Sequence, residues 1–257
     1  MSMFRGLRVL YCAMLFVGTV ALLLLLPEAP GWLRPVVIGV WLVAVFITCE
    51  AVGYGRLKKV NSLLDDCRVR EYADYWERML PRVGGKNALT AKLNLAAGYL
   101  EMGEAQRALD LLQTVPTLPE KGSYASYRLV YDNNMLVARR MLGQLDEADA
   151  LLQAYRQHLD AVPPKLAERT RIRPFYENQT MLQRMARGDF DGAATFFAER
   201  LRTAPTLRSR VAASYSLAWA LSHEGRADEA RPHLTFAAEQ GGDTWYASAA
   251  RARLEQL

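Results

Sequence analysis

Apolar and polar positions follow two different patterns along the chain. The first 55 residues are mostly apolar, whereas the remainder shows apolar residues at the 3.6-residue period of amphipathic helices. Residues 9–26 contain no charged side chain, and residues 35–53 contain only Glu50. Runs of this length, about 20 residues, are long enough to cross a bilayer as helices. We therefore predict two membrane spans, at about residues 9–26 and 35–54, within an N-terminal hairpin of residues 1–55.

A cleaved secretory signal is the alternative interpretation of the first apolar run. Its apolar core is longer than that of most signals, no small-x-small cleavage site follows it, and a second apolar run comes almost immediately. These features favour a two-helix anchor that holds the chain in the lipid bilayer through residues 9–54.

The basic residues that flank the two runs predict their orientation. Two arginines precede the first run and three basic residues follow the second, whereas the turn between the runs contains one arginine beside an acid. The positive-inside rule then places both termini in the cytoplasm, an arrangement compatible with a bacterial inner-membrane protein. Glu50 has two interpretations: a functional carboxylate within the membrane, or a side chain that reaches the cytoplasmic interface six residues before Arg56.

A short phrase recurs four times in the remainder of the chain. In each copy an alanine lies five residues after a glycine, with apolar helical sequence on both sides. The four pairs are Gly103 and Ala108, Gly143 and Ala148, Gly188 and Ala193, and Gly225 and Ala230. A helix that ends at a glycine and restarts at once, several times over, predicts stacked helical hairpins. The expected fold class is therefore all-α.

The residues around the first phrase resemble the tetratricopeptide repeat family. Leu95, Ala96 and Tyr99 match the large, small and tyrosine positions of the family's front helix, Gly103 matches the turn, and Ala108 matches the returning helix. The resemblance implies an α-solenoid of about four to five helical hairpins over residues 56–257, with clear repeats over about residues 88–242. It implies that small residues lie where two helices approach closely and that the glycine adopts a positive φ.

This sequence departs from the family's pattern in three respects. Arg139 and Arg184 stand where the second and third repeats should have a tyrosine. The intervals between successive glycines are 40, 45 and 37 residues, compared with about 34 residues in the family. We therefore expect an irregular array, closed by a capping helix over residues 243–257. Acids three residues after the glycine, Asp146, Asp191 and Asp228, should complement the positive ends of the returning helices.

The chain shows little sign of catalytic or cofactor chemistry. Its three histidines, His158, His223 and His233, form no close pair with one another or with a cysteine, so no metal site is expected. No nucleophile elbow, dinucleotide fingerprint or phosphate loop is present. The net charge of +5 is a weak signal for nucleic acid, and no basic motif supports it. We predict a protein that is not an enzyme and binds no cofactor, metal or nucleic acid.

In the family that the repeats resemble, the front helices line a concave groove that binds peptide segments or partner helices. The positions that the glycine register assigns to this groove are Leu93, Ala97, Asn133, Val137, Arg140, Phe175, Asn178, Leu182, Met185, Tyr215 and Trp219. Asn133 and Asn178 each lie ten residues before the glycine of their own repeat. Their amides could hold an extended peptide backbone, or they could be exposed residues in a coincidental register.

Several arginines near the groove also allow two interpretations: they could attract acidic peptides by pairing with carboxylates, or they could belong to an ordinary solvated surface. They are Arg139, Arg140, Arg171, Arg173, Arg184 and Arg187. The sequence as a whole favours a membrane-anchored scaffold that binds a protein or peptide partner at the cytoplasmic face and could help to assemble a membrane complex. Two alternatives remain open: a non-catalytic subunit of a membrane enzyme or transporter, and a homo-oligomeric structural protein.

Overall fold

The structure, a computed structural model, describes residues 3–25, 30–119, 124–161 and 172–256. Every regular element within these ranges is a helix, which confirms the all-α fold class. The chain divides into two compact units, Met1–Asn61 and Ser62–Leu257. Each unit is described by itself.

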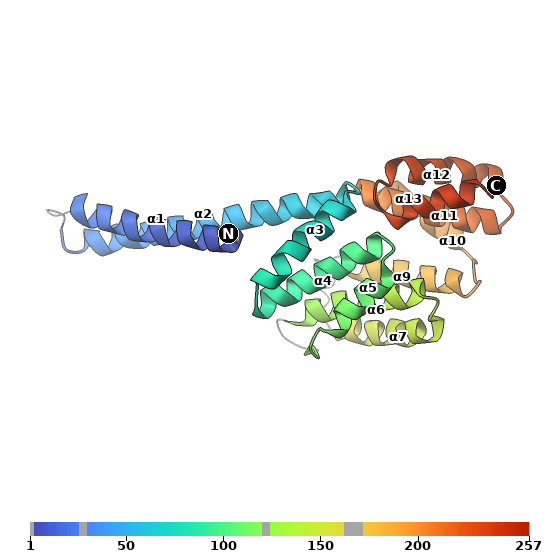
Figure 1. Cartoon of the computed structure of the whole chain (residues 1–257), viewed down its shortest axis with the longest axis horizontal. Helices are drawn as coiled ribbons and strands as arrows, with labels where there is room; N and C mark the ends of the chain where they lie inside the picture. The colour runs from blue at the N-terminus through green and yellow to red at the C-terminus, as the bar shows by residue number, and fades with distance from the viewer. Residues whose placement is uncertain (1–2, 26–29, 120–123, 162–171, 257) are drawn as a thin grey trace. The chain divides into compact units, whose positions relative to one another are not determined.

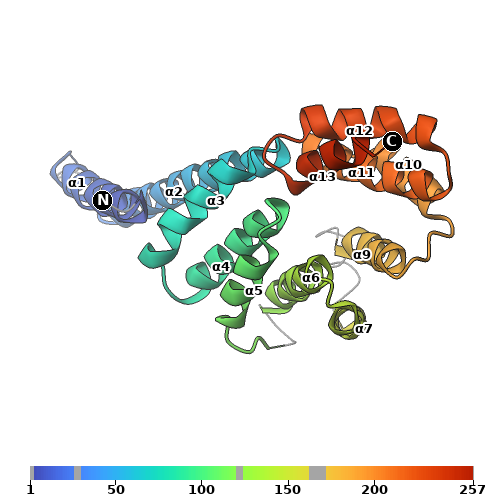
Figure 2. The ribbon, with the colours of Figure 1, turned by 45° about the vertical axis from the view of Figure 1, so that its right-hand side comes forward.

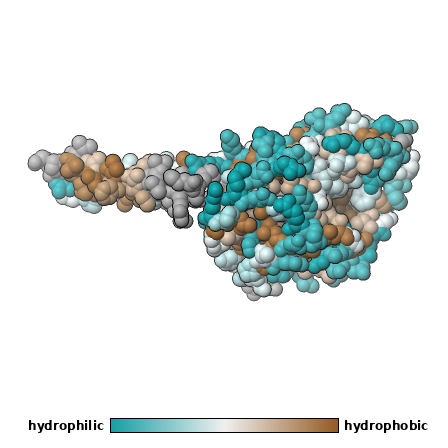
Figure 3. All heavy atoms as spheres, in the orientation of Figure 1, coloured by the Kyte–Doolittle hydropathy of each residue, from teal (hydrophilic) through white to brown (hydrophobic). Residues whose placement is uncertain are grey.

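The first unit contains helix α1, Met3–Leu25, and most of helix α2, Leu33–Asp65. The two helices lie side by side (Figures 1 and 2), and Gly18 of α1 directly faces the ring of Trp41 in α2, where a Cβ atom would clash. Their large apolar side chains otherwise point outward: Phe16 is 72% exposed and Val40 is 65% exposed. Figure 3 shows these apolar residues along the described part of the two helices.

One helix in the described residues, α2, is long and apolar enough to cross a membrane. Its 33 residues span about 50 Å, which exceeds the roughly 30 Å of a bilayer's hydrocarbon core. Only 6% of its most apolar window is buried within the protein. The apolar part of α1, Tyr11–Leu24, is shorter. Helix α2 also continues beyond the predicted end of the span near residue 54. Its polar residues remain helical as far as Asp65.

The second unit is a series of helices in which each packs mainly against its neighbours in the chain, with α4 also contacting α6 and α6 also contacting α9 (Figure 2). The elements are α3 (Val69–Met79), η1 (Leu80–Arg82), α4 (Gly85–Glu101), α5 (Ala105–Gln113), α6 (Ala125–Met141), α7 (Leu145–Asp160), α9 (Ile172–Ala186), α10 (Ala193–Thr203), α11 (Leu207–His223), α12 (Ala227–Gln240) and α13 (Trp245–Leu254).

The recurring glycines end the front helices as expected. Gly103, Gly143, Gly188 and Gly225 have φ values of 84°, 73°, 85° and 75°. In each turn the amide after the glycine donates to a carbonyl five residues earlier; Glu104 N–H, for example, donates to Tyr99 C=O at 2.8 Å. This hydrogen bond defines the Schellman motif, which requires a left-handed residue at the glycine position. The predicted role of the phrase in ending helices is therefore confirmed.

The alanines of the same phrases are completely enclosed. Ala108, Ala148, Ala193 and Ala230 are each 0% exposed. A methyl group is the largest side chain that fits where the backbones of two helices come this close.

The third turn differs from the other three. Helix α10 starts only at Ala193, after a second left-handed glycine, Gly192. Asp191 therefore precedes the helix, whereas Asp146 and Asp228 lie in the first turns of α7 and α12. The expected placement of Asp191 in a first helical turn is wrong, because α10 begins only at the alanine of its phrase, whereas α5, α7 and α12 begin two residues after their glycines.

The first and last elements of the second unit touch. The backbone bends at Cys67, between α2 and α3, where φ is 61°. Asp243 N–H donates to Cys67 C=O at 3.1 Å, and Gly242 leaves no room for a Cβ atom beside that carbonyl. Cys67 is 1% exposed and belongs to the same apolar cluster as α11 and α12. Helix α13 packs against α12, and the turn that precedes it contacts the bend at Cys67.

Candidate functional site

The predicted groove positions have very different exposures. Leu93, Met185 and Tyr215 are buried, at 2%, 1% and 6% exposure. Phe175 is 49% exposed, and the remaining positions are partly exposed. The accessible ones therefore concentrate on α6 and α9, in the middle of the predicted groove.

Helix α13 covers the end of the predicted groove on α11. Tyr215 makes edge-on contacts with the rings of Trp245 and Tyr246, at centroid distances of 5.2 and 5.7 Å. Its hydroxyl accepts a hydrogen bond from Arg253 Nε at 3.1 Å, and the Arg253 guanidinium also lies 5.3 Å from the ring of Trp219. Tyr215 thus forms part of the packing between helices. The glycine spacing places Tyr215 on the groove face of α11, but this spacing does not show that α13 packs against that face.

The two asparagines at equivalent repeat positions differ in their hydrogen bonding. Asn133 donates to Asn134 Oδ1 at 3.4 Å, and Asn134 in turn donates to the carbonyl of Leu93 at 3.0 Å. The Oδ1 atom of Asn133 is buried without a partner among the described residues. Asn178 is partly exposed, and no contact of its amide appears in the same part of the chain. Within the described residues the Asn178 amide is therefore available as a donor and an acceptor.

Two partly buried arginines, Arg140 and Arg208, form hydrogen bonds between front helices, and these bonds differ in the charge of the acceptor. Arg208 of α11 donates to Glu101 of α4 at 2.7 Å, across 107 residues of sequence. Burial lowers the pKa of Arg208, but the charge and the hydrogen bond of Glu101 more than compensate, so its net pKa is raised. Arg140 of α6 donates from Nη2 to the neutral Gln179 of α9 at 2.6 Å. Burial lowers the pKa of Arg140 to about 10.

Two of the other arginines near the groove pair with nearby acids. Arg184 pairs with Asp189 at 2.7 Å, and Arg187 pairs with Asp146 and Asp149. Arg139 donates to Gln144 at 2.6 Å. These contacts favour the solvated-surface interpretation for this group. Arg173 is exposed, and Arg171 lies outside the described residues.

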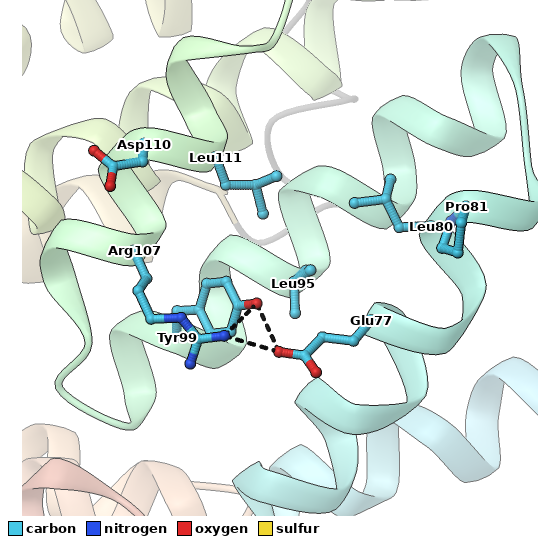
Figure 4. Close-up of a pocket in the computed structure, with 8 residues that line it drawn as sticks. All are labelled: Glu77, Leu80, Pro81, Leu95, Tyr99, Arg107, Asp110 and Leu111. Atoms are coloured by element: carbon cyan, nitrogen blue, oxygen red, sulfur yellow. Dashed lines mark hydrogen bonds and ion pairs between the residues drawn. The ribbon is translucent and has the colours of Figure 1, made fainter.

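An open pocket of about 460 Å³ lies between α3, η1, α4 and α5 (Figure 4). Four apolar residues line it: Leu80, Pro81, Leu95 and Leu111. Leu95 lies two residues from the predicted groove position Leu93, about 200° around α4. The pocket therefore opens on the opposite side of this helix from the predicted groove.

A polar network closes one end of this pocket. The Tyr99 hydroxyl donates to Glu77 Oε1 at 2.7 Å, and Arg107 Nη2 contacts both Glu77 Oε1, at 3.1 Å, and the hydroxyl, at 3.0 Å. The Arg107 guanidinium also lies 4.2 Å from the Tyr99 ring centroid. Burial, followed by the bond to Glu77, raises the pKa of Tyr99 to about 12. Because Glu77, Tyr99 and Arg107 come from α3, α4 and α5, this network stabilises the contact between three helices.

A second buried polar cluster joins α6 to α7. Asp132 is 2% exposed; its Oδ2 lies 2.6 Å from Nδ1 of His158, and its Oδ1 accepts from Arg128 Nε at 3.1 Å. Burial raises the pKa of Asp132, although the contacts with His158 and Arg128 oppose the shift. Sequence reasoning did not identify this cluster. The spacing of Arg128 and Asp132, four residues apart on one helix, was the available signal.

The described residues contain no group of three or more histidines, cysteines or acids that could hold a metal ion. The three cysteines are not disulfide-bonded. No protein-family model matches the chain, and the comparisons with curated proteins and with solved structures found no match either.

Proposed function

We propose that this protein is a membrane-anchored scaffold without catalytic activity, which presents a helical array to a protein partner at the cytoplasmic face of the membrane. The observation that carries the proposal is the character of α2. Only 6% of its apolar window is buried within the protein, and its last residues belong to a unit built from helical hairpins. An apolar helix of this length with so much exposed surface favours a lipid environment.

The helical array is best interpreted as an α-solenoid similar to the tetratricopeptide repeat family. Four turns share the left-handed glycine and the Schellman hydrogen bond, and each is followed by a fully enclosed alanine. Such arrays usually act through binding rather than catalysis, because stacked hairpins create an extended surface. Ion pairs that join successive helices, such as Glu77 of α3 with Arg107 of α5, fit a structural role.

The anchor is proposed to be a hairpin of two spans, with α1 crossing beside α2 and both termini in the cytoplasm. Support comes from the contact between Gly18 and Trp41, the exposed apolar surface of both helices and the basic residues that flank the two runs. A bacterial inner membrane is the proposed location.

The partner is proposed to bind across α6 and α9. Here the accessible groove positions gather: Asn133 and Val137 on α6, and Phe175, Asn178 and Leu182 on α9. Phe175 is an unusually exposed large apolar side chain for the second unit, and Asn178 is partly exposed with no amide contact among the described residues. Exposed aromatic residues beside unpaired amides are the pattern expected of a surface that binds a peptide.

The experiment is co-purification from native membranes of the full chain and of the Asn133→Ala/Asn178→Ala double variant, with identification of the captured proteins. Glu239→Ala, an exposed acid on α12, is the matched control. We expect the double variant to lose at least one partner that the wild type and the control retain, with unfolding temperatures that remain similar. An identical set of partners in all three would contradict the proposed surface.

A further inference from the structure

Arg140 is a largely enclosed cation for which the described residues supply no counter-charge. Its Nη2 atom donates to Gln179, whose amide is neutral, and its Nη1 atom is fully buried with no hydrogen-bond partner in the described ranges. Within the same ranges Tyr246 is the titratable group whose charge acts on Arg140, and no carboxylate does so. A charged group taken out of water without a partner costs several kcal/mol, by order of magnitude.

Arg208 provides an internal comparison. The charge of the same tyrosine, Tyr246 of α13, acts on it, and the carboxylate of Glu101 lies 2.7 Å from its Nη1 atom. Among the described residues the protein therefore supplies a carboxylate to one of these two guanidinium groups and a neutral amide to the other. Because an unpaired buried charge destabilises a fold, its presence on a predicted binding face indicates that a ligand supplies the missing anion.

We infer that Arg140 is the recognition residue for a single carboxylate of an acidic side chain in a partner protein that docks between α6 and α9. The inference rests on the proposed scaffold function and names the chemistry of its partner. One positive charge beside the neutral amide of Gln179 and the ring of Tyr246 matches the single charge of a carboxylate better than the nearly double charge of a phosphate. Arg140 is partly exposed but its Nη1 atom is buried, so binding of the carboxylate requires the side chain to change rotamer.

The unfolding temperature of the free protein tests, without any ligand, whether Arg140 lacks a counter-charge. We expect Arg140→Met to leave the unfolding temperature of the full chain in detergent unchanged or to raise it, since an apolar side chain of similar length removes an uncompensated charge. Arg208→Met should lower that temperature by about 5 °C or more, because it leaves Glu101 buried without its partner. If Arg140→Met destabilises the protein as much as Arg208→Met does, the chain supplies its own counter-charge, for instance from Glu168 outside the described residues, and the inference is overturned.

Peptide binding tests which chemical group Arg140 recognises. The full-length protein is exposed to three pools of random dodecapeptides that each carry one glutamate, one glutamine or one phosphoserine at a fixed position. We expect the glutamate pool to be retained at least about tenfold better than the glutamine pool, as charge-assisted hydrogen bonds predict. Arg140→Met should abolish this preference. Arg139→Gln, which removes a neighbouring charge that contacts Gln144, should preserve it.

The outcomes that contradict the carboxylate assignment can be distinguished from those that contradict the scaffold function. Equal retention of the glutamate and glutamine pools overturns the carboxylate assignment but leaves the scaffold function standing. Stronger retention of the phosphoserine pool overturns the assignment in favour of phosphate. Retention of no pool counts against both the carboxylate and the scaffold.

Discussion

At the scale of single residues, the most informative positions are the four glycines at the turns. Each lies in the left-handed region, and a Cβ atom added at Gly143 would meet no other atom within 4 Å. The requirement for glycine at this position therefore comes from the backbone conformation alone.

We predict that Gly143→Ala lowers the free energy of unfolding by about 1–2 kcal/mol, the cost of a left-handed conformation for an ordinary residue. Gly143→Asn should cost less, because asparagine tolerates this region better. Thermal unfolding of the full chain, followed by circular dichroism, measures both. Equal stability of the alanine variant and the wild type would show that the turn does not hold this conformation.

Cys67 is the residue for which burial has the clearest chemical consequence. It is 1% exposed, and burial, followed by the charge of Glu101, raises its pKa to about 11. At pH 8 roughly one thiol in a thousand would be ionised.

We expect iodoacetamide to alkylate Cys67 in the folded protein at least about 100-fold more slowly than in the denatured chain, because both access and ionisation are suppressed. Mass spectrometry of the peptide that contains Cys67 gives both rates. Rapid labelling in the folded protein would show that the bend is open. Topology studies should accordingly use an introduced cysteine at an exposed position such as Glu239.

At the scale of helices, the α6–α7 hairpin depends on the buried carboxylate of Asp132. Replacement by alanine removes the partner of His158, which is 13% exposed, and of Arg128, which is 24% exposed. We predict that Asp132→Ala costs about 2–4 kcal/mol of unfolding free energy, measured by denaturant titration. His158→Asn, which leaves the carboxylate paired with Arg128, should cost less.

The same carboxylate predicts a pH dependence. Burial raises the pKa of Asp132 in the folded state above the value of 3.8 for an unperturbed aspartate. The stability that the group contributes is therefore complete below pH 3.8 and is lost as the pH rises through the raised value. The unfolding free energy of the wild type, relative to that of Asp132→Asn, should decrease over this window. An increase over the same range would mean that the contacts with His158 and Arg128 outweigh burial.

The sequence predicted the local features of these helices and missed the long-range ones. Turn conformation and the burial of the alanines depend on residues within one hairpin, so a single repeat contains the signal. The burial of Tyr215 depends on how α13 packs, and the pair of Glu101 with Arg208 joins helices that are 107 residues apart in sequence. No pattern within one hairpin specifies contacts of this kind.

The groove prediction illustrates the same limit at the level of the candidate site. Asn178 and Phe175 are accessible as expected, whereas Leu93 and Met185, assigned by the same register, are buried. A register places a residue on one side of its helix, but the neighbouring helices decide whether that side is open.

At the scale of the whole molecule, the account assigns anchoring to residues 9–54 and partner binding to residues 62–257. The exposed apolar surface of α2 and the separate compactness of the two units support this division of roles. If the hairpin serves only as an anchor, its sequence is replaceable as long as its apolar length and flanking basic residues are kept. A transport or enzyme subunit, by contrast, would require specific residues such as Glu50 within the membrane.

The most direct test of this account exchanges residues 9–54 of the full chain for an unrelated two-span anchor with the same flanking charges and compares the partners captured by crosslinking in native membranes. The account predicts that the chimera reaches the membrane and captures the same partners as the wild type, and that both lose them with Asn133→Ala/Asn178→Ala. A chimera that reaches the membrane but captures none of the wild-type partners would contradict the scaffold and assign the function to the membrane hairpin itself.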